Sequence, residues 1–182
     1  MILDRVRSVN LDGETHDGEP DLFNGADRGR MPVTVVFTTI EGTLAALNAA
    51  AHLSQGLGAQ IAICVTEVVS FRYLIQGLPD SISFFQRLCT ALVNESCLDD
   101  VGIEVHLCRD QVECLEARLR PRSIVIIGAR RCWWPWRERH LERALKQRGF
   151  DALLIKANAG GLASRPEMVV QRMLEQAREI TQ

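Results

Sequence analysis

Short apolar runs alternate with amphipathic stretches along most of the chain. Each run is four to ten residues long and rich in β-branched residues, which is typical of strands buried in a sheet. Each is followed by apolar residues at helical spacing. This alternation predicts an α/β fold, a three-layer sandwich whose mainly parallel five-stranded sheet carries helices on both faces. The five predicted strands span residues 33–38, 60–69, 103–108, 124–127 and 151–156.

Local signals place the predicted helices between these strands. The first helix is expected to begin at Thr43, and the second at a cap formed by Asp80 or Ser81. The third follows Asp110, which stands three residues before Glu113 as in a capping box. The fourth is expected to end at Gly149.

The strand at residues 103–108 alternates apolar with polar side chains, Glu104 and His106 among them. This pattern favours a strand that is open on one face or lies near an edge.

The pattern also divides the chain into three parts. Residues 1–31 are polar and show no sustained periodicity, which predicts a flexible leader. Residues 32–158 form the α/β domain. Residues 159–182 are predicted to add a C-terminal helix, with Ser164 as its cap and Glu167 three residues later.

Composition narrows the setting. The chain has 182 residues, 47% of them hydrophobic, and a net charge of −2. No apolar run reaches the roughly 20 residues that span a bilayer, and the first residues lack the apolar core of a signal peptide. We therefore expect a cytoplasmic protein with no membrane partner.

Cysteine and histidine give no catalytic or metal-binding pattern. The six cysteines form no CxxC pair and no zinc-ligand spacing, so most are expected to be buried as small apolar groups. Cys132 is an exception because it lies among arginines, which lower a thiol pKa. The four histidines have no catalytic partner at a suggestive spacing. No catalytic residue and no metal site is predicted.

Positive charge and tryptophan gather in one segment. Residues 118–148 carry ten arginine or lysine residues against two glutamates. Within this segment lie all three tryptophans, Trp133, Trp134 and Trp136. The indoles could pack over the sheet, dock on another protein or stack on a nucleotide. Packing is the first interpretation and a protein interface the second. Nucleic acid is not expected, because no recognition motif accompanies the basic helix.

Common nucleotide and nucleophile motifs are missing. FTTIEGT follows the first strand where a dinucleotide-binding fold carries GxGxxG, and neither GxxxxGK[ST] nor GxSxG occurs.

From about Val33 to about Lys156 the chain resembles the universal stress protein family. The likeness rests on VTVVFTTIEGTLAALNAAAHLSQGLGAQIAICVTEVV and on SIVIIG followed by a basic loop and LERALKQRGFDALLI. The resemblance implies the strand order 3-2-1-4-5, a role in the stress response and a homodimer formed through the last strand. It also implies a site for ATP or AMP, which many members of the family bind.

The chain departs from that family at the nucleotide site. Thr38 stands where ATP-binding members carry an aspartate, and Arg131 replaces the second glycine of their GxxG loop after Gly128. The later Gly-Ser or Gly-Thr pair falls near Glu138 and Arg139. Side chains at glycine positions obstruct the approach of backbone N–H groups to phosphate.

We therefore predict a non-enzymatic binding or regulatory protein with a degenerate nucleotide site and no bound cofactor. The alternatives are an ATP or AMP binder, with weak ATP hydrolysis at most, that uses arginine side chains, and an adaptor that docks a protein partner through the tryptophans. In the nucleotide-binding alternative, the ligand crevice would comprise Thr38, Thr39, Val65, Gly128, Ala129, Arg130, Arg131 and Arg139.

Overall fold

The computed structural model describes residues 31–57, 59–70, 79–96, 98, 100–121, 123–130 and 135–157. The predicted leader, apart from Met31, and the predicted C-terminal helix lie outside these residues. So do Arg131, Cys132, Trp133 and Trp134.

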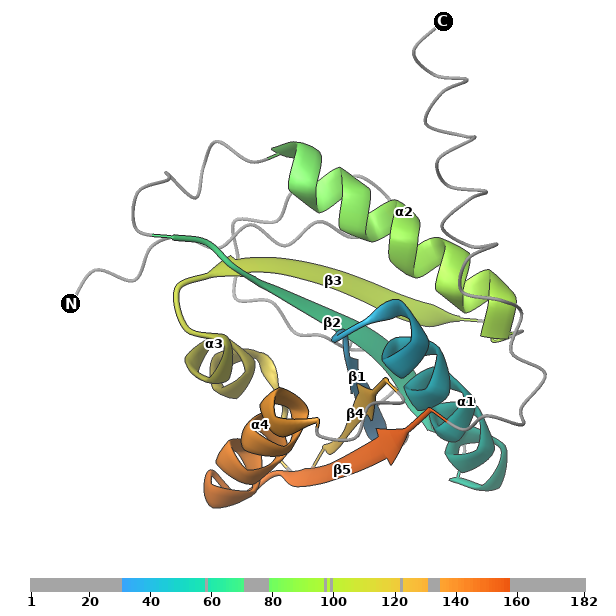
Figure 1. The fold of residues 1–182 in the computed structure, drawn as a ribbon. Helices are drawn as coiled ribbons and strands as arrows, with labels where there is room; N and C mark the ends of the chain where they lie inside the picture. The colour runs from blue at the N-terminus through green and yellow to red at the C-terminus, as the bar shows by residue number, and fades with distance from the viewer. Residues whose placement is uncertain are drawn as a thin grey trace, which may run out of the picture.

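Strands and helices alternate through the described chain (Figure 1). All strand pairs are parallel and the sheet order is β3-β2-β1-β4-β5, so the predicted α/β fold and strand order are confirmed. The elements are β1 (Pro32–Val36), α1 (Ile40–Leu57), β2 (Gln60–Val68), α2 (Pro79–Ser96), β3 (Val101–Cys108), α3 (Gln111–Arg118), β4 (Ile124–Ala129), α4 (Trp136–Gln147) and β5 (Asp151–Lys156).

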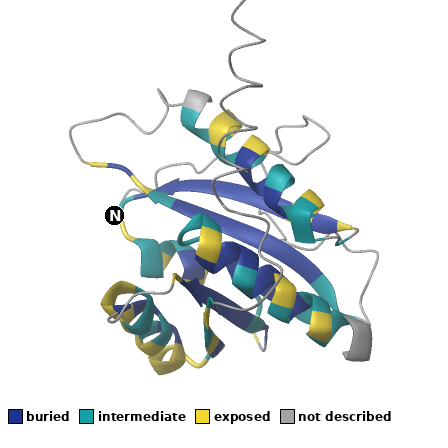
Figure 2. Ribbon diagram, turned by 45° about the vertical axis from the view of Figure 1, so that its right-hand side comes forward, coloured by how far each residue is buried: buried dark blue, intermediate teal, exposed yellow. Residues whose placement is uncertain are grey.

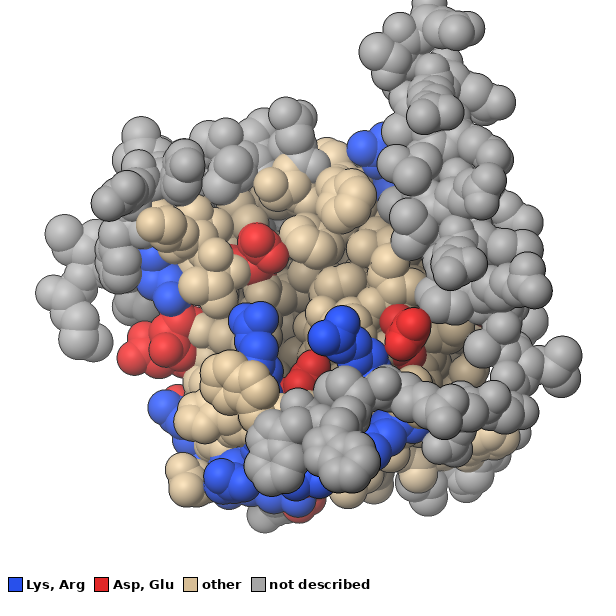
Figure 3. All heavy atoms as spheres, viewed as in Figure 1, with Lys and Arg blue, Asp and Glu red and all other residues tan. Residues whose placement is uncertain are grey.

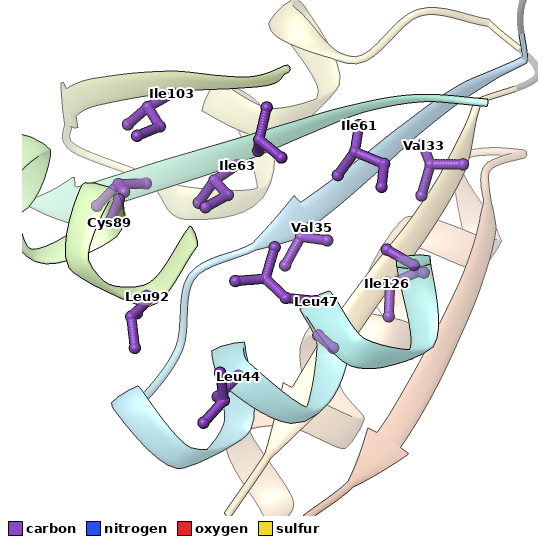
Figure 4. Close-up of a cluster of buried hydrophobic side chains, with 14 of the residues drawn as sticks. Val33, Val35, Leu44, Leu47, Ile61, Ile63, Cys89, Leu92, Ile103 and Ile126 are labelled. Carbon is purple, nitrogen blue, oxygen red and sulfur yellow. The ribbon is translucent and has the colours of Figure 1, made fainter. Parts of the chain in front are cut away.

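Two apolar layers enclose the sheet. Helices α1 and α2 lie on one face and α3 and α4 on the other (Figure 1). On the first face, Leu44 and Leu47 of α1 point toward Val35 of β1 and Ile126 of β4 (Figure 4). The layer on the second face comprises Val36, Cys64, Leu115, Leu119, Val125, Ile127, Leu141, Leu145 and Ala152.

The strands are buried on both faces because side chains alternate along a strand and helices cover each side. The sheet is mostly dark blue in Figure 2, whereas the helices expose part of their surface. This explains why β1 and β4 are almost continuously apolar in sequence. Thr34 is the buried polar residue of β1.

Three local predictions need correction. Helix α1 begins at Ile40 rather than Thr43, because the Thr39 side chain accepts a hydrogen bond from the Gly42 N–H (3.1 Å) and starts the helix earlier. Helix α2 begins at Pro79, before the expected cap. Strand β3 is an edge strand as predicted, but Glu104 and His106 are buried because α3 packs against β2 and β3.

Two predicted helix ends are confirmed. The Asp110 side chain accepts hydrogen bonds from the N–H groups of Val112 and Glu113 and so caps α3 (2.8 and 2.9 Å). Gly149 follows the last turn of α4 with a φ of +86°, a conformation that side-chain-bearing residues rarely adopt.

Candidate functional site

The predicted crevice lies where the carboxyl ends of β1 and β4 meet. These neighbouring strands mark the point where the strand order reverses, which is where open α/β sheets usually bind ligands. Thr38 and Thr39 follow β1, and Gly128 and Ala129 end β4. The structure therefore brings four of the predicted site residues together at the carboxyl ends of the two inner strands β1 and β4.

Backbone fills the space beside Gly128. A Cβ atom added to Gly128 would lie 1.7 Å from the carbonyl oxygen of Gly42, and one added to Gly42 would lie 2.6 Å from the carbonyl oxygen of Gly128. The first turn of α1 thus rests directly on the backbone of β4. Glycine is required at both positions for this contact. Gly128 is therefore needed for the packing of α1 on β4. Its match to the first glycine of a phosphate-binding loop does not indicate this role.

Thr38 bridges the two strand ends. Its hydroxyl donates a hydrogen bond to the carbonyl oxygen of Gly128 (2.5 Å), and its backbone N–H donates to Oγ1 of Thr43 (3.3 Å). With the Thr39 cap, these bonds commit polar groups of the β1–α1 loop to partners within the protein. An aspartate at position 38 could not make the same bridge, because a carboxylate only accepts hydrogen bonds.

The other predicted residues are placed differently. The side chain of Val65 is buried in the core layer beneath α1 and α2, and that of Ala129 is also buried. Arg130 is exposed directly after β4. Arg139 lies in the first turn of α4, where its N–H donates to the carbonyl of Pro135 (3.0 Å). Arg131 lies outside the described residues.

Trp136 is the first residue of α4 and is 63% exposed. Packing over the sheet is therefore the wrong interpretation for this indole. Trp133 and Trp134 lie outside the described residues, so their part in a docking surface stays a prediction.

The surface of α4 is basic. Lys and Arg side chains gather over this part of the face shown in Figure 3, with acidic side chains nearby. Lys146 pairs with Glu142 (2.7 Å), and Arg148, directly after α4, pairs with Glu116 of α3 (2.5 Å). Exposed pairs of this kind contribute little to stability, so their main effect is to offset part of the positive charge.

A second cluster, which the sequence interpretation missed, lies between α3 and the β2–β3 pair. The His106 Nε2 atom is 2.9 Å from Oε2 of Glu104, and the two residues are 0% and 5% exposed. Within the described chain, the His106 Nδ1 atom and one terminal nitrogen of Arg118 are buried without a hydrogen-bond partner. On the same side, the Gln111 amide donates to the Thr66 hydroxyl (2.9 Å).

Thiols share this layer. The Cys108 thiol donates a hydrogen bond to the carbonyl of Glu67 (3.6 Å). Its interaction with Cys114, followed by burial, raises the pKa of Cys108. The interaction with Cys108 lowers the pKa of Cys114, burial opposes this effect, and the Arg118 guanidinium lowers the pKa further. Burial raises the pKa of Cys64, with a smaller contribution from Cys114.

A sequence signal for this cluster exists. Residues 104, 106 and 108 share one face of a strand, and residues 111, 114 and 118 share one face of a helix. A search for CxxC spacing does not consider cysteines that are six residues apart, one on a strand and one on the helix that follows it.

In the described ranges, no group of three or more His, Cys, Asp or Glu side chains is arranged to hold a metal ion. No described helix has both the length and the apolar character needed to cross a membrane.

Comparisons with known proteins give a likeness in structure but none in sequence. No protein-family model and no curated protein matches the chain. Among solved structures, the chain is similar to a universal stress protein in complex with cAMP, with 13% sequence identity and a TM-score of 0.47. The match covers 71% of this chain and 98% of that one. The likeness concerns the fold alone.

Proposed function

We propose that this chain is a non-enzymatic binding and regulatory protein whose crevice between β1 and β4 has lost the backbone cradle for a nucleotide. The observation that carries this proposal is the bridge from the Thr38 hydroxyl to the carbonyl of Gly128. A ligand that needed this crevice open would have to replace that hydrogen bond. It would also have to fit without separating the backbones of Gly42 and Gly128, which are in direct contact.

The energetics favour the closed arrangement. A buried carbonyl left without a donor loses about 1–3 kcal/mol. The Thr38 bridge satisfies the Gly128 carbonyl within the protein, so opening the crevice requires a ligand that donates to the same oxygen. Phosphate oxygens at neutral pH mainly accept hydrogen bonds and do not meet this requirement. The hydrogen bond made by Thr38 therefore helps to keep the crevice closed.

Calorimetric titration with ATP and with AMP tests the proposal. We expect no saturable heat at ligand concentrations up to about 1 mM, which corresponds to less than about 4 kcal/mol of binding free energy. The main alternative is a nucleotide held by arginine side chains, and the exposure of Arg130 at the end of β4 favours it. Micromolar binding that is lost in Arg130→Ala but retained in Arg143→Ala would establish that alternative. Release of phosphate from ATP by the wild type alone would extend it to weak hydrolysis.

Self-association through β5 is a second part of the proposal. Strand β5 is the last strand of the sheet and pairs with β4 on one side. Leu153 of β5 is 44% exposed, so this edge presents an apolar side chain beside unpaired backbone. These features support a homodimer formed by the two β5 edges.

Sedimentation of two matched variants tests the dimer. Leu153→Lys places a charge on the β5 edge and is expected to shift the protein toward monomer. Phe84→Lys is the control, because Phe84 of α2 is similarly exposed (48%) but lies on a helix away from this edge. Equal dissociation in both variants, or none in either, would argue against the β5 interface.

Docking of a protein partner is the third candidate, favoured by the exposed indole of Trp136. Exposed tryptophan beside arginine is a common anchor at protein interfaces. If the surface acts in docking, Trp136→Ala weakens partner capture and leaves the unfolding free energy within about 0.5 kcal/mol of the wild type. Unchanged capture would remove the candidate.

A further inference from the structure

Helix α4 turns a basic and aromatic face toward solvent. The helix packs against β5, β4 and α3, and its buried residues are Leu141 and Leu145. Trp136, His140 and Arg143 recur at helical spacing on the opposite side, and all three are exposed. These three side chains form one stripe, which we call the outer face of α4.

Two arginines of this surface lack a charge partner among the described residues. Arg143 lies on the outer face and Arg137 lies beside it, and both are exposed. In the part of the chain that the structure describes, the ion pairs of this region are made by Lys146 and Arg148 instead. The charges of Arg137 and Arg143 are therefore open to an anion from elsewhere.

The leader carries the complementary charge. Residues 12–27 contain neither lysine nor arginine, and Leu22 and Phe23 add apolar surface to the same segment. Its six acidic residues are Asp12, Glu14, Asp17, Glu19, Asp21 and Asp27. Residues 118–148 hold ten basic residues against two glutamates. Opposite charges of this number attract the two segments to each other.

The leader joins the domain at the end of the sheet where α4 ends. It leads into β1 at Pro32, and the first residues of β1, β4 and β5 are in register, Val33 with Ile124 and Ile124 with Asp151. Two strand spacings measure about 10 Å, and a helix of the length of α4 measures about 18 Å. A flexible chain of about 20 residues spans about 25 Å on average. Residues 12–27 can therefore reach along the outer face.

We propose that the acidic segment of the leader, residues 12–27, docks on the outer face of α4 within the same chain. Its carboxylates face Arg137 and Arg143, and its apolar pair covers the indole of Trp136. The docked segment closes this face to other anions and to protein partners. The contact is separate from the crevice between β1 and β4, and it does not depend on the function proposed for that crevice.

Tethering makes a weak contact sufficient. Short flexible linkers give effective concentrations of about 1 mM, so a contact with a Kd of about 0.1 mM would be about 90% occupied. The Debye length is about 8 Å at physiological salt and about 3 Å at 1 M. Because the charges on both sides are exposed or lie in a polar segment, the docking should weaken as salt rises.

Carbodiimide cross-linking of the full chain tests the docking, because the reagent joins carboxylates directly to amines. The sequence has two lysines, Lys146 and Lys156. Arg143→Lys keeps the positive charge and adds an amine to the outer face. Phe84→Lys is the matched control, because Phe84 is exposed on α2, on the other side of the sheet (Figure 1). We expect the leader to be linked at position 143 and not at position 84, with a yield that falls about threefold or more between about 0.05 M and about 0.5 M NaCl.

Three cross-linking results would overturn the proposal. Equal linking at positions 84 and 143 would mean that the leader has no preferred surface. The absence of a link at position 143 would mean that the leader does not dock on α4. When chains of two isotopic compositions are mixed before the reaction, links found only between different chains would assign the contact to a second copy.

Binding of a labelled synthetic peptide of residues 12–27 tests the same contact without cross-linking. In the full chain, Asp17→Asn, Glu19→Gln and Asp21→Asn together remove three carboxylates and should free the outer face. We expect the peptide to bind this variant about fivefold or more tightly than it binds the wild type, whose own leader competes. Addition of Arg143→Gln should abolish the gain, whereas Arg87→Gln, which changes an exposed arginine of α2, should not.

Two peptide-binding results would contradict the proposal. Equal affinity of the peptide for the wild type and for the triple variant would mean that the leader does not occupy the face. Binding of single-stranded RNA, but not of the peptide, to both proteins would assign the face to nucleic acid.

Discussion

The Thr38 hydroxyl donates to the carbonyl oxygen of Gly128 across 90 residues of sequence and joins the carboxyl ends of β1 and β4. The same carbonyl group lies against Gly42 in the first turn of α1. The carboxyl ends of β1 and β4 and the first turn of α1 therefore meet at one point.

Substitution of Gly128 by alanine tests the tight contact. The added Cβ would overlap the Gly42 carbonyl, so α1 or β4 must move. We expect a loss of about 3 kcal/mol or more in the free energy of unfolding, measured by urea denaturation. Gly102→Ala is the matched control in a strand, because its Cβ would meet Ala62 at an ordinary 3.6 Å. A Gly128→Ala protein as stable as Gly102→Ala would disprove the contact.

Loss of the bridge itself is tested by Thr38→Val. Valine keeps the shape of threonine but removes the donor, which leaves the Gly128 carbonyl unsatisfied. The unfolding free energy should fall by about 1–2 kcal/mol. Thr38→Ser retains the hydroxyl and should recover most of the loss. Equal stability of the valine and serine variants would mean that the hydroxyl contributes nothing.

The sequence predicts the framework of the molecule because burial follows from alternation. The apolar runs at β1 and β4 and the helical spacing around Leu141 and Leu145 reveal strands and helices without knowledge of tertiary contacts. The start of α3 can also be predicted from the sequence, because the Asp110 side-chain cap is a local signal.

What the sequence does not predict depends on contacts between distant segments. The EGT at residues 41–43 reads as a loop because glycine disfavours helix, yet it forms the first turn of α1 against Gly128. Glu104 and His106 read as exposed because charged residues usually are, yet each satisfies part of the other's hydrogen-bonding capacity beneath α3. The crevice residues Thr38 and Gly128 were predicted to be neighbours, but their hydrogen bond was not.

The buried Glu104–His106 pair should show strong coupling. Glu104→Ala removes the only hydrogen-bond partner that the described structure gives to the His106 ring, and we expect a loss of about 3 kcal/mol. The double variant Glu104→Leu/His106→Leu should be less destabilised than the sum of the two single leucine variants, since no polar group is then stranded. Additive losses in denaturation experiments would show that the two side chains do not act as a pair.

Alkaline pH should destabilise the protein through its buried thiols. Burial raises the pKa of Cys89 from 9.0 to about 12. Between these values the unfolded chain has lost the Cys89 proton while the folded protein retains it, so the unfolding free energy falls as pH rises. Below about pH 9 the contribution is fully present. Cys89 lies among Leu92 and Ile103 in the core (Figure 4).

Cys89→Val isolates this effect. The slope of unfolding free energy against pH between about pH 9 and pH 11 should become shallower by up to about 1.4 kcal/mol per pH unit. Cys114→Ser is the comparison, because the pKa of Cys114 is lowered rather than raised. An identical slope in wild type and Cys89→Val would contradict the assignment.

The closed crevice is tested most directly by amide chemical shifts of the isotope-labelled full chain during addition of ATP. We predict that the N–H signals of Thr38, Gly42, Gly128 and Ala129 stay in place throughout the titration, because their neighbourhood is already filled by protein. Saturable shifts centred on Gly128 and Ala129, at micromolar ATP and with release of the Thr38 hydroxyl from its bond, would contradict it.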